Sequence, residues 1–115
     1  MNKTDKEALK QAVYEIVIRI PRGRATSYGA IAKASGYPNM SRMVGKIMGE
    51  CDTTTNTIPA HRVVNSQGIL SAKDAFKDPE EMQRLLEAEN IIVINNRIAN
   101  WKKVFWNPIE EIQLD

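Results

Sequence analysis

Proline and glycine residues divide the first half of this chain into short segments, and they limit the folds open to it. Pro21 and Gly23 end a run of apolar residues that are spaced as on one face of a helix. A second break spans positions 36–39, with a glycine at its start and a proline at position 38. A proline inside a helix costs about 3 kcal/mol, so no long helix crosses either break. The sequence therefore predicts three separate short helices.

Capping residues give the limits of the second and third helices. Ser27 can cap a helix that runs to Ala34, and Gly36 can end it. Ser41 can cap another helix, which runs to about Met48. Two short helices joined by a tight turn that contains glycine are typical of a helix-turn-helix.

The third helix, SRMVGKIMG, has two faces. Its apolar residues can pack in a core, whereas Arg42, Gly45 and Lys46 can lie on the exposed side. Gly45 costs about 1 kcal/mol of helix propensity relative to alanine. Two explanations remain open: a ligand approaches the backbone closely at this point, or a neighbouring helix packs tightly against it.

Charge is unevenly distributed along the chain. The 115 residues include 16 Lys and Arg against 14 Asp and Glu, so the net charge of +2 says little about partners. Between positions 16 and 49, however, there is no acidic residue. Six basic residues lie in that window: Arg19, Arg22, Arg24, Lys33, Arg42 and Lys46. Such a segment suits a polyanion such as nucleic acid, and the alternative is a solvated surface that happens to lack acids.

Length and composition fit one compact domain over residues 1–115, of which 43% are hydrophobic. No stretch approaches the roughly 20 apolar residues of a membrane span, and the first residues lack a secretory signal. Cys51 is the single cysteine, so an internal disulfide is excluded and a reducing cytoplasm is the expected location. No spacing of Cys, His and Asp suggests a metal site, and no cofactor is expected.

The second half combines short strands with one helix. Val63-Val64 and Ile69-Leu70 flank the turn sequence Asn-Ser-Gln-Gly, which predicts a β-hairpin. The sequence DPEE from position 78 predicts a helix start, and positions 91–94 predict a strand before an Asn-Asn turn. The predicted fold is α+β and mainly helical, a single small domain with a helix-turn-helix and a short β-hairpin.

The sequence IPAHRVVNSQG, from Ile58 to Gly68, has the composition of a reactive site. A rigid proline precedes Ala60, His61 and Arg62, and a short buried strand follows them. The two polar side chains are therefore held still between a bend and a strand. The residue at the bend itself is Ala60, which has no reactive group.

Three motifs, in this order, resemble those of the O6-alkylguanine-DNA alkyltransferases. They are RIPRGRATSYGAIAKASG, SRMVGKIM and IPAHRVVNSQG, which is the active-site motif PCHRV with Ala60 in place of the cysteine. In that family a thiolate attacks the alkyl carbon, and the adjacent His, oriented by a Glu, takes the thiol proton. A methyl side chain cannot accept an alkyl group. The chain therefore resembles the alkyltransferase-like proteins, which lack this cysteine and bind damaged DNA without reaction.

The resemblance implies a role for each matching residue. Tyr28 helps to rotate the target nucleotide outward, and Arg42 enters the duplex from the minor groove to replace the flipped base. Lys73 can stack on that base as a cation. The implied DNA-binding residues are Tyr28, Arg42, Gly45, Lys46 and Lys73, and the implied base pocket consists of Tyr28, Ala60, Val63, Lys73 and Asp74. His61, Arg62 and Glu89 are left as a structural remnant, with no catalytic residue.

The implied function is recognition of O6-alkylguanine in duplex DNA by base flipping, without alkyl transfer. The expected partners are DNA that contains the lesion and nucleotide excision repair proteins, which the bound monomer would direct to the damage. Two alternatives remain open. One is a helix-turn-helix transcription regulator on an inactive transferase scaffold, and the other is an active transferase that uses Cys51 as a displaced acceptor.

Overall fold

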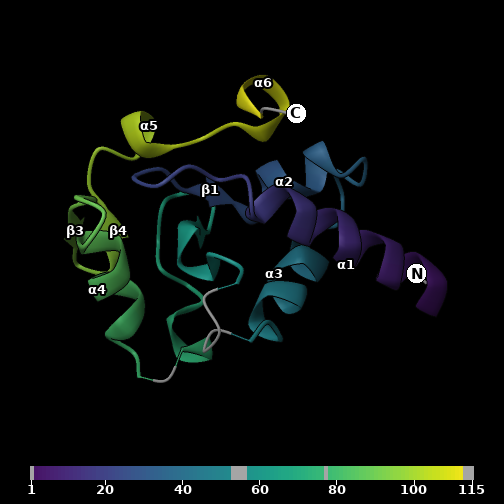
Figure 1. The fold of residues 1–115 in the computed structure, drawn as a ribbon, viewed down its shortest axis with the longest axis horizontal. Coiled ribbons are helices and arrows are strands. Elements are labelled where there is room, and N and C mark those ends of the chain that lie inside the picture. Colours follow the sequence, from purple (N-terminus) through teal and green to yellow (C-terminus); the bar gives the residue numbers. More distant parts are fainter. Residues whose placement is uncertain (1, 53–56, 77, 113–115) are drawn as a thin grey trace.

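The structure is a computed structural model that describes residues 2–52, 57–76 and 78–112. Three helices form one end of the molecule (Figure 1): α1 (Lys3–Val17), α2 (Tyr28–Ala34) and α3 (Ser41–Gly49). The side chain of Asn2 caps α1 by accepting a hydrogen bond from the N–H of Asp5 at 2.8 Å. The helix buries the face that its apolar spacing predicts: Leu9, Val13, Ile16 and Val17.

Helices α2 and α3 pack against each other and form the predicted helix-turn-helix. Ser27 caps α2 as predicted, because its Oγ accepts from the N–H of Ala30 at 3.1 Å. Gly36 follows with a φ of +87°, a conformation that favours glycine. The prediction that Ser41 caps α3 was wrong: Ser41 is the first helical residue, and the cap position is occupied by Met40 without a side-chain hydrogen bond.

A two-stranded parallel sheet lies at the centre. It pairs β1 (Thr26–Ser27) with β2 (Val63–Val64), and the short 3-10 helix η1 (Ala60–Arg62) leads directly into β2. The predicted hairpin between positions 63–64 and 69–70 was therefore wrong. The Asn-Ser-Gln-Gly turn still reverses the chain, with the N–H of Asn65 donating to the carbonyl of Ile69 at 3.1 Å, but β2 pairs with a strand from the first half.

The other end of the molecule contains the 3-10 helix η2 (Lys73–Ala75), α4 (Glu81–Glu87) and an antiparallel hairpin of β3 (Val93–Ile94) and β4 (Arg97–Ile98). The predicted strand and its Asn-Asn turn are confirmed, and both asparagines have positive φ. Helix α4 begins at Glu81, three residues after the predicted cap, because Asp78 instead accepts from the N–H of Glu80 in a preceding turn.

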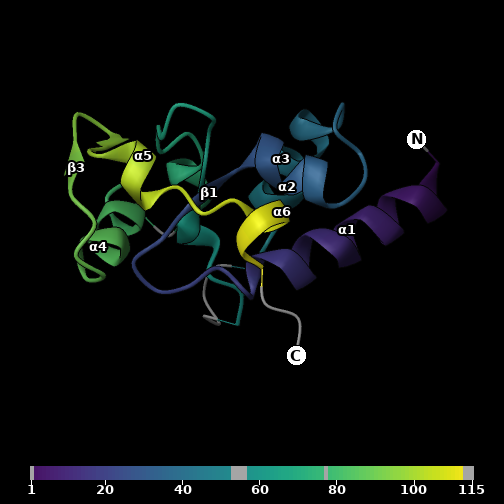
Figure 2. The same cartoon turned by 90° about the horizontal axis from the view of Figure 1, so that it is seen from above.

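The C-terminal segment connects the two ends. Residues 101–111, with α5 (Trp101–Val104) and α6 (Pro108–Glu111), cross the molecule from the hairpin to the first three helices (Figure 1). On the way the segment pairs with Ala25, whose carbonyl accepts from the N–H of Trp106 at 2.7 Å. Helix α6 then rests on α2 (Figure 2).

One hydrophobic core runs through both ends of the molecule and includes residues from the helices, the central sheet and the C-terminal segment. Trp106 is only 2% exposed within it. The sequence AKDAFK predicts a surface loop, but Phe76 within it is buried. Among the described residues, none of the helices has the length and apolar character that crossing a membrane requires.

Candidate functional site

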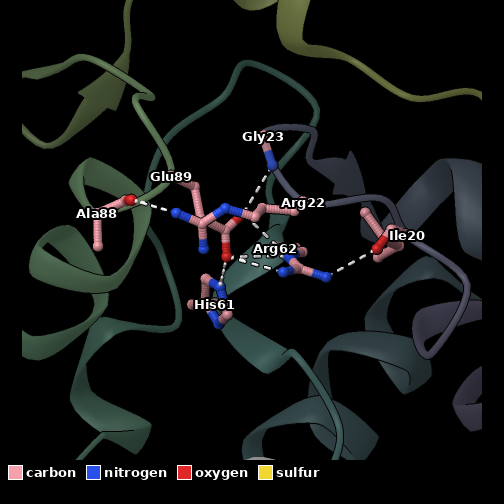
Figure 3. Close-up of polar contacts among 7 residues, drawn as sticks. All are labelled: Ile20, Arg22, Gly23, His61, Arg62, Ala88 and Glu89. Carbon is pink, nitrogen blue, oxygen red and sulfur yellow. Dashed lines mark hydrogen bonds and ion pairs between the residues drawn. The ribbon is translucent and has the colours of Figure 1, made fainter.

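His61 and Arg62 meet Glu89 in a polar cluster around its buried carboxylate (Figure 3). His61 Nε2 lies 2.6 Å from Glu89 Oε2, and Arg62 donates to both carboxylate oxygens at 2.9–3.1 Å. The N–H of Gly23 donates to Oε1 at 2.8 Å, and Arg62 also donates to the carbonyl of Ile20 at 2.8 Å. These side-chain hydrogen bonds connect η1 to the chain reversal after α1 and to Glu89, just after α4.

The protonation states in this cluster follow from its contacts. Burial alone would raise the pKa of Glu89, but hydrogen bonds from Arg62, the N–H of Gly23 and His61 outweigh it and lower the pKa from 4.5 to about 2. Burial lowers the pKa of His61, against the opposing effect of Glu89, so the imidazole is neutral at pH 7. Because the ionised carboxylate only accepts, Nε2 of His61 carries the hydrogen.

Ala60 lies beside this cluster at the edge of a cavity of about 370 Å³. The residue is 7% exposed, and its methyl group gives the cavity no nucleophile. The cavity has a largely apolar wall with polar groups on one side. Its lining includes Ile18, Arg22, Ile58, Pro59, His61, Phe76 and Leu85.

A second groove, of about 400 Å³, lies along the helix-turn-helix. Arg42, at the start of α3, is exposed beside it, and Tyr28, the first residue of α2, lies over Gly45. Burial raises the pKa of the Tyr28 phenol, and its hydroxyl oxygen lies 3.3 Å from Ser71 Oγ. The opposite wall is the loop after β2. The lining residues are Tyr28, Gly29, Ser41, Arg42, Gly45, Asn65 and Ser66.

The structure brings only some of the predicted site residues together. Tyr28, Arg42 and Gly45 share the groove, and Lys46 is exposed on the same helix. The predicted base pocket does not form one cavity: Ala60 lines the other cavity, and Val63 is 1% exposed. Lys73 and Asp74 lie on η2 and line neither space. Their roles stay predictions.

Sequence reasoning missed the second wall of the groove. Asn65 and Ser66 were interpreted only as turn residues, although turn loops that follow a short strand often carry binding groups. The polar sequence CDTTTNT, which begins at Cys51, predicts an exposed loop after α3, and for Cys51 this prediction was wrong. Cys51 is buried at the end of α3, where burial raises the pKa of its thiol, with a further contribution from Asp52 and an opposing one from Lys10. Residues 53–56 of that predicted loop lie outside the described residues.

The acid-free basic window does not form a single surface. Arg19 donates to a carbonyl of α1, and Arg22 donates to the carbonyl of Ala88. Arg24 donates to the carbonyls of Val104 and Phe105 and pairs with Glu111 at 3.1 Å. None of the four ion pairs between charged side chains in residues 2–52, 57–76 and 78–112 includes Lys33, Arg42 or Lys46. In those same ranges, no group of three or more His, Cys, Asp or Glu residues is arranged to hold a metal ion.

Comparison with known proteins connects this geometry to a family. The sequence model described as "6-O-methylguanine DNA methyltransferase, DNA binding domain" matches residues 8–91. A DNA base-flipping protein of Vibrio parahaemolyticus is 36% identical over 96 residues, which cover 84% of this chain and 93% of that protein. Alkyltransferase-like protein 1 of Schizosaccharomyces pombe is 32% identical over 100 residues, which cover 84% of this chain and 92% of that protein.

Solved structures agree with the sequence comparison. The fold matches the crystal structure of S. pombe Atl1 in complex with damaged DNA containing O6-carboxymethylguanine, with a TM-score of 0.77 and 30% identity. That match covers 92% of this chain and 98% of the other. The crystal structure of Mycobacterium tuberculosis OGT in complex with DNA matches with a TM-score of 0.59 and 32% identity, over 70% of this chain and 48% of the other.

Proposed function

The chain belongs to the family of the 6-O-methylguanine DNA methyltransferase DNA-binding domain, and on that premise we propose that it recognises O6-alkylguanine in double-stranded DNA. It turns the damaged base out of the helix and transfers no alkyl group, and residues 1–115 act as one DNA-binding domain. Ala60 is the observation that carries this proposal. A methyl group stands beside His61, whose Nε2 is hydrogen-bonded to Glu89, at the place where a transferase needs its nucleophile.

The buried thiol of Cys51 is a poor substitute for that nucleophile. A cysteine attacks as the thiolate, and burial raises the pKa of this one. Cys51 also lines neither the cavity at Ala60 nor the groove at Arg42. These facts favour binding without reaction over a displaced acceptor.

The proposed roles follow the two spaces. In the groove, Arg42 replaces the flipped base, Tyr28 turns the nucleotide outward, and Gly45 and Lys46 face the DNA backbone. The base is received by a pocket of Tyr28, Ala60, Val63, Lys73 and Asp74, which assembles as the base enters. His61, Arg62 and Glu89 hold the fold of the former active site and do no chemistry.

Relatives support DNA damage as the target, since one is named a DNA base-flipping protein and another is seen on DNA with O6-carboxymethylguanine. A lesion that is bound and not repaired needs other proteins to remove it, so we propose that the complex marks the site for nucleotide excision repair. A cytoplasmic location is part of the proposal, because the free thiol of Cys51 suits a reducing compartment.

The test compares two duplexes of identical sequence, one with a single O6-methylguanine. We expect tighter binding to the damaged duplex, unchanged protein mass after incubation, and a rise in fluorescence from 2-aminopurine placed next to the lesion as stacking is lost. Binding that follows sequence and ignores the lesion would instead support a transcription regulator. A protein mass increased by one methyl group would show a transferase.

Replacing Arg42 tests the flipping step. Arg42→Ala should weaken binding to the damaged duplex by about 1–3 kcal/mol, because nothing then fills the space left by the base. Lys3→Ala is the control, because it removes the same charge at the exposed start of α1, a helix whose N-terminal end points away from α2 and α3 (Figure 2). Equal losses in the two variants, each still folded by circular dichroism, would refute a specific role for Arg42.

A further inference from the structure

The loop that forms the second wall of the groove is short and polar. Within it, Asn65 Oδ1 accepts from the N–H groups of Gln67 and Ile69, both at 2.9 Å, and the carbonyl of Asn65 accepts from Gly68 at 3.0 Å. Ser66 and Gln67 are exposed. Because these internal bonds all return to Asn65, they shape the loop but do not fix its direction relative to α3.

Three donors outside the loop fix its direction, two from β4 and one from the start of α5. Trp101 Nε1 donates to the carbonyl of Ser66 at 3.1 Å, and Arg97 Nε donates to the carbonyl of Gln67 at 2.9 Å. The N–H of Ile98 donates to the carbonyl of Gly68 at 2.9 Å. Three consecutive carbonyls of the loop are therefore held by one short segment, residues 97–101.

Packing reinforces these hydrogen bonds. Gly68 has a φ of +82°, and a Cβ there would lie 3.1 Å from the Trp101 ring, so the backbone of the loop sits directly on the indole. The indole in turn contacts the ring of Phe105, with centroids 5.3 Å apart. The loop therefore rests on two aromatic rings that pack against each other at an angle of 54°.

We propose that Arg97 and Trp101 are positioning residues for the DNA interface. They hold the loop of residues 65–68 at the distance from Arg42 that a DNA strand requires, although neither lines the groove. This inference rests on the proposed function. This support lies outside the part of the chain that the family's sequence model matches, because both residues follow position 91.

Two conservative variants remove one hydrogen bond each. Trp101→Phe keeps an aromatic ring on Gly68 but loses the donor to Ser66, and Arg97→Gln loses the donor to Gln67. Lys102→Gln is the control, because it removes one exposed cation from the same segment. We expect the first two to weaken binding to the O6-methylguanine duplex about threefold to tenfold, as the loss of one hydrogen bond predicts, and the control to change it less than twofold.

A second readout separates positioning from general stability. Amide hydrogen exchange in the protein without DNA should speed up at Gln67, Gly68 and Ile69 in Trp101→Phe and Arg97→Gln, with the thermal midpoint within about 2 °C of the parent protein. Unchanged exchange, or faster exchange with unchanged affinity for DNA, would overturn the inference. Failure of the parent protein itself to bind the damaged duplex would instead overturn the proposed function, and the inference with it.

A double-mutant cycle gives the sharpest test. Ser66→Ala removes a hydroxyl from the wall of the groove without touching the carbonyl that Trp101 holds. If Trp101 acts by positioning Ser66 toward DNA, the fold loss of DNA affinity caused by Ser66→Ala should be at least twofold smaller in the Trp101→Phe background than in the parent protein. Strict additivity of the two losses would show that Trp101 does not act through this loop.

Discussion

The reason for a glycine at position 45 of α3 is decided by its surroundings in the structure and not by the sequence. Its helix propensity is poor, and the sequence allowed either a close ligand or a tightly packed neighbour as the reason. A Cβ built at Gly45 would lie 4.0 Å from the nearest atoms, those of the Tyr28 ring, which is ordinary van der Waals contact. Packing therefore does not require glycine here, and the explanation that remains is an approach from the groove side.

Gly45→Ala should separate stability from binding. The variant should be more stable by about 0.5–1 kcal/mol, because alanine favours the helix and its methyl group has room. Its affinity for the damaged duplex should fall about tenfold, because that methyl group lies in the groove. Gly49→Ala, at the other end of α3 and with open space around it, should change stability alone. Undiminished DNA affinity in Gly45→Ala would exclude close approach of the DNA.

Lys73 is the residue proposed to sense the base. Alkylation at O6 removes the N1 proton of guanine and redistributes charge over the ring, and a cation stacked on that ring detects the change by roughly 0.5–2 kcal/mol. Lys73→Ala should therefore narrow the ratio of affinities for alkylated and plain duplexes, and Lys73→Arg should preserve or widen it. Equal weakening on both duplexes, with a shallower dependence on salt, would mean that Lys73 contacts only phosphate.

At this scale, local chemistry was predictable and contact partners were not. The cap at Ser27 and the turn at Gly36 depend on neighbours within four residues, and both are confirmed. The place of Ser66 in the groove depends on α3, which forms the opposite wall. The contact of Arg24 depends on Glu111, 87 residues away. Nothing in a short stretch of sequence specifies such a partner.

At the scale of elements, the basic residues between positions 16 and 49 fall into two groups, one that holds the fold together and one that faces solvent. Arg24 belongs to the fold, since its guanidinium holds two carbonyls and a carboxylate of the C-terminal segment. Lys46 projects from α3 and takes part in none of the ion pairs among the described residues. The uniform charge pattern of the sequence thus conceals one structural and one solvent-facing group.

Matched substitutions should reveal this division. Arg24→Gln should lower the free energy of unfolding by about 1–3 kcal/mol, because partly buried carbonyls lose a charged donor, and should leave the salt dependence of DNA binding unchanged. Lys46→Gln should do the reverse, with little change in stability and a slope of log K against log salt that is smaller by about 1. A smaller slope in Arg24→Gln would return Arg24 to the DNA-binding surface.

The prediction of a hairpin at positions 63–70 failed because the pairing partner of a strand is decided between elements and not by its own residues. Val63-Val64 has the composition of a buried strand and is one, and the turn that follows it does reverse the chain. The ladder partner of β2 is Thr26–Ser27, however, and the returning segment pairs with β4 instead, with Ile69 opposite Arg97. Composition indicates that a strand forms, whereas its partner is decided by the packing of distant segments.

In the molecule as a whole, Glu89 joins segments that are far apart in the sequence. Its carboxylate receives hydrogen bonds from Gly23, His61 and Arg62, while Arg22 reaches back to the carbonyl of Ala88 (Figure 3). The resemblance to the alkyltransferases implies that Glu89 orients His61, and the two side chains do meet. The contribution of the N-terminal half, through Gly23 and Ile20, carries no sequence signal.

This cluster should make stability depend on pH in the acid range. The pKa of Glu89 is about 2 in the folded protein against 4.5 in the unfolded chain, so the unfolded state binds the proton first as pH falls. The contribution, about 3 kcal/mol, is complete above pH 4.5 and is lost as pH falls toward 2.

Urea denaturation at a series of pH values measures this loss. Between pH 6 and pH 3, the free energy of unfolding should fall less in Glu89→Gln than in the parent protein, and Glu110→Gln, an exposed carboxylate, should behave like the parent. Because Glu89→Gln leaves Arg62 buried without its partner, carbon-detected NMR titration of Glu89 in the parent protein gives an independent value. A midpoint near 4.5 would contradict the proposed network.

The methyl group of Ala60 bears on how many lesions one molecule can serve in its lifetime. A protein that takes an alkyl group onto its own thiol is spent after one event, so its copy number must match the number of lesions. Under the proposed function, a chain with Ala60 leaves each lesion chemically unchanged and can return to the free pool. Its performance would then be set by residence time: it would need to stay on the lesion long enough for the proposed repair proteins to find it, and dissociate soon enough to serve again.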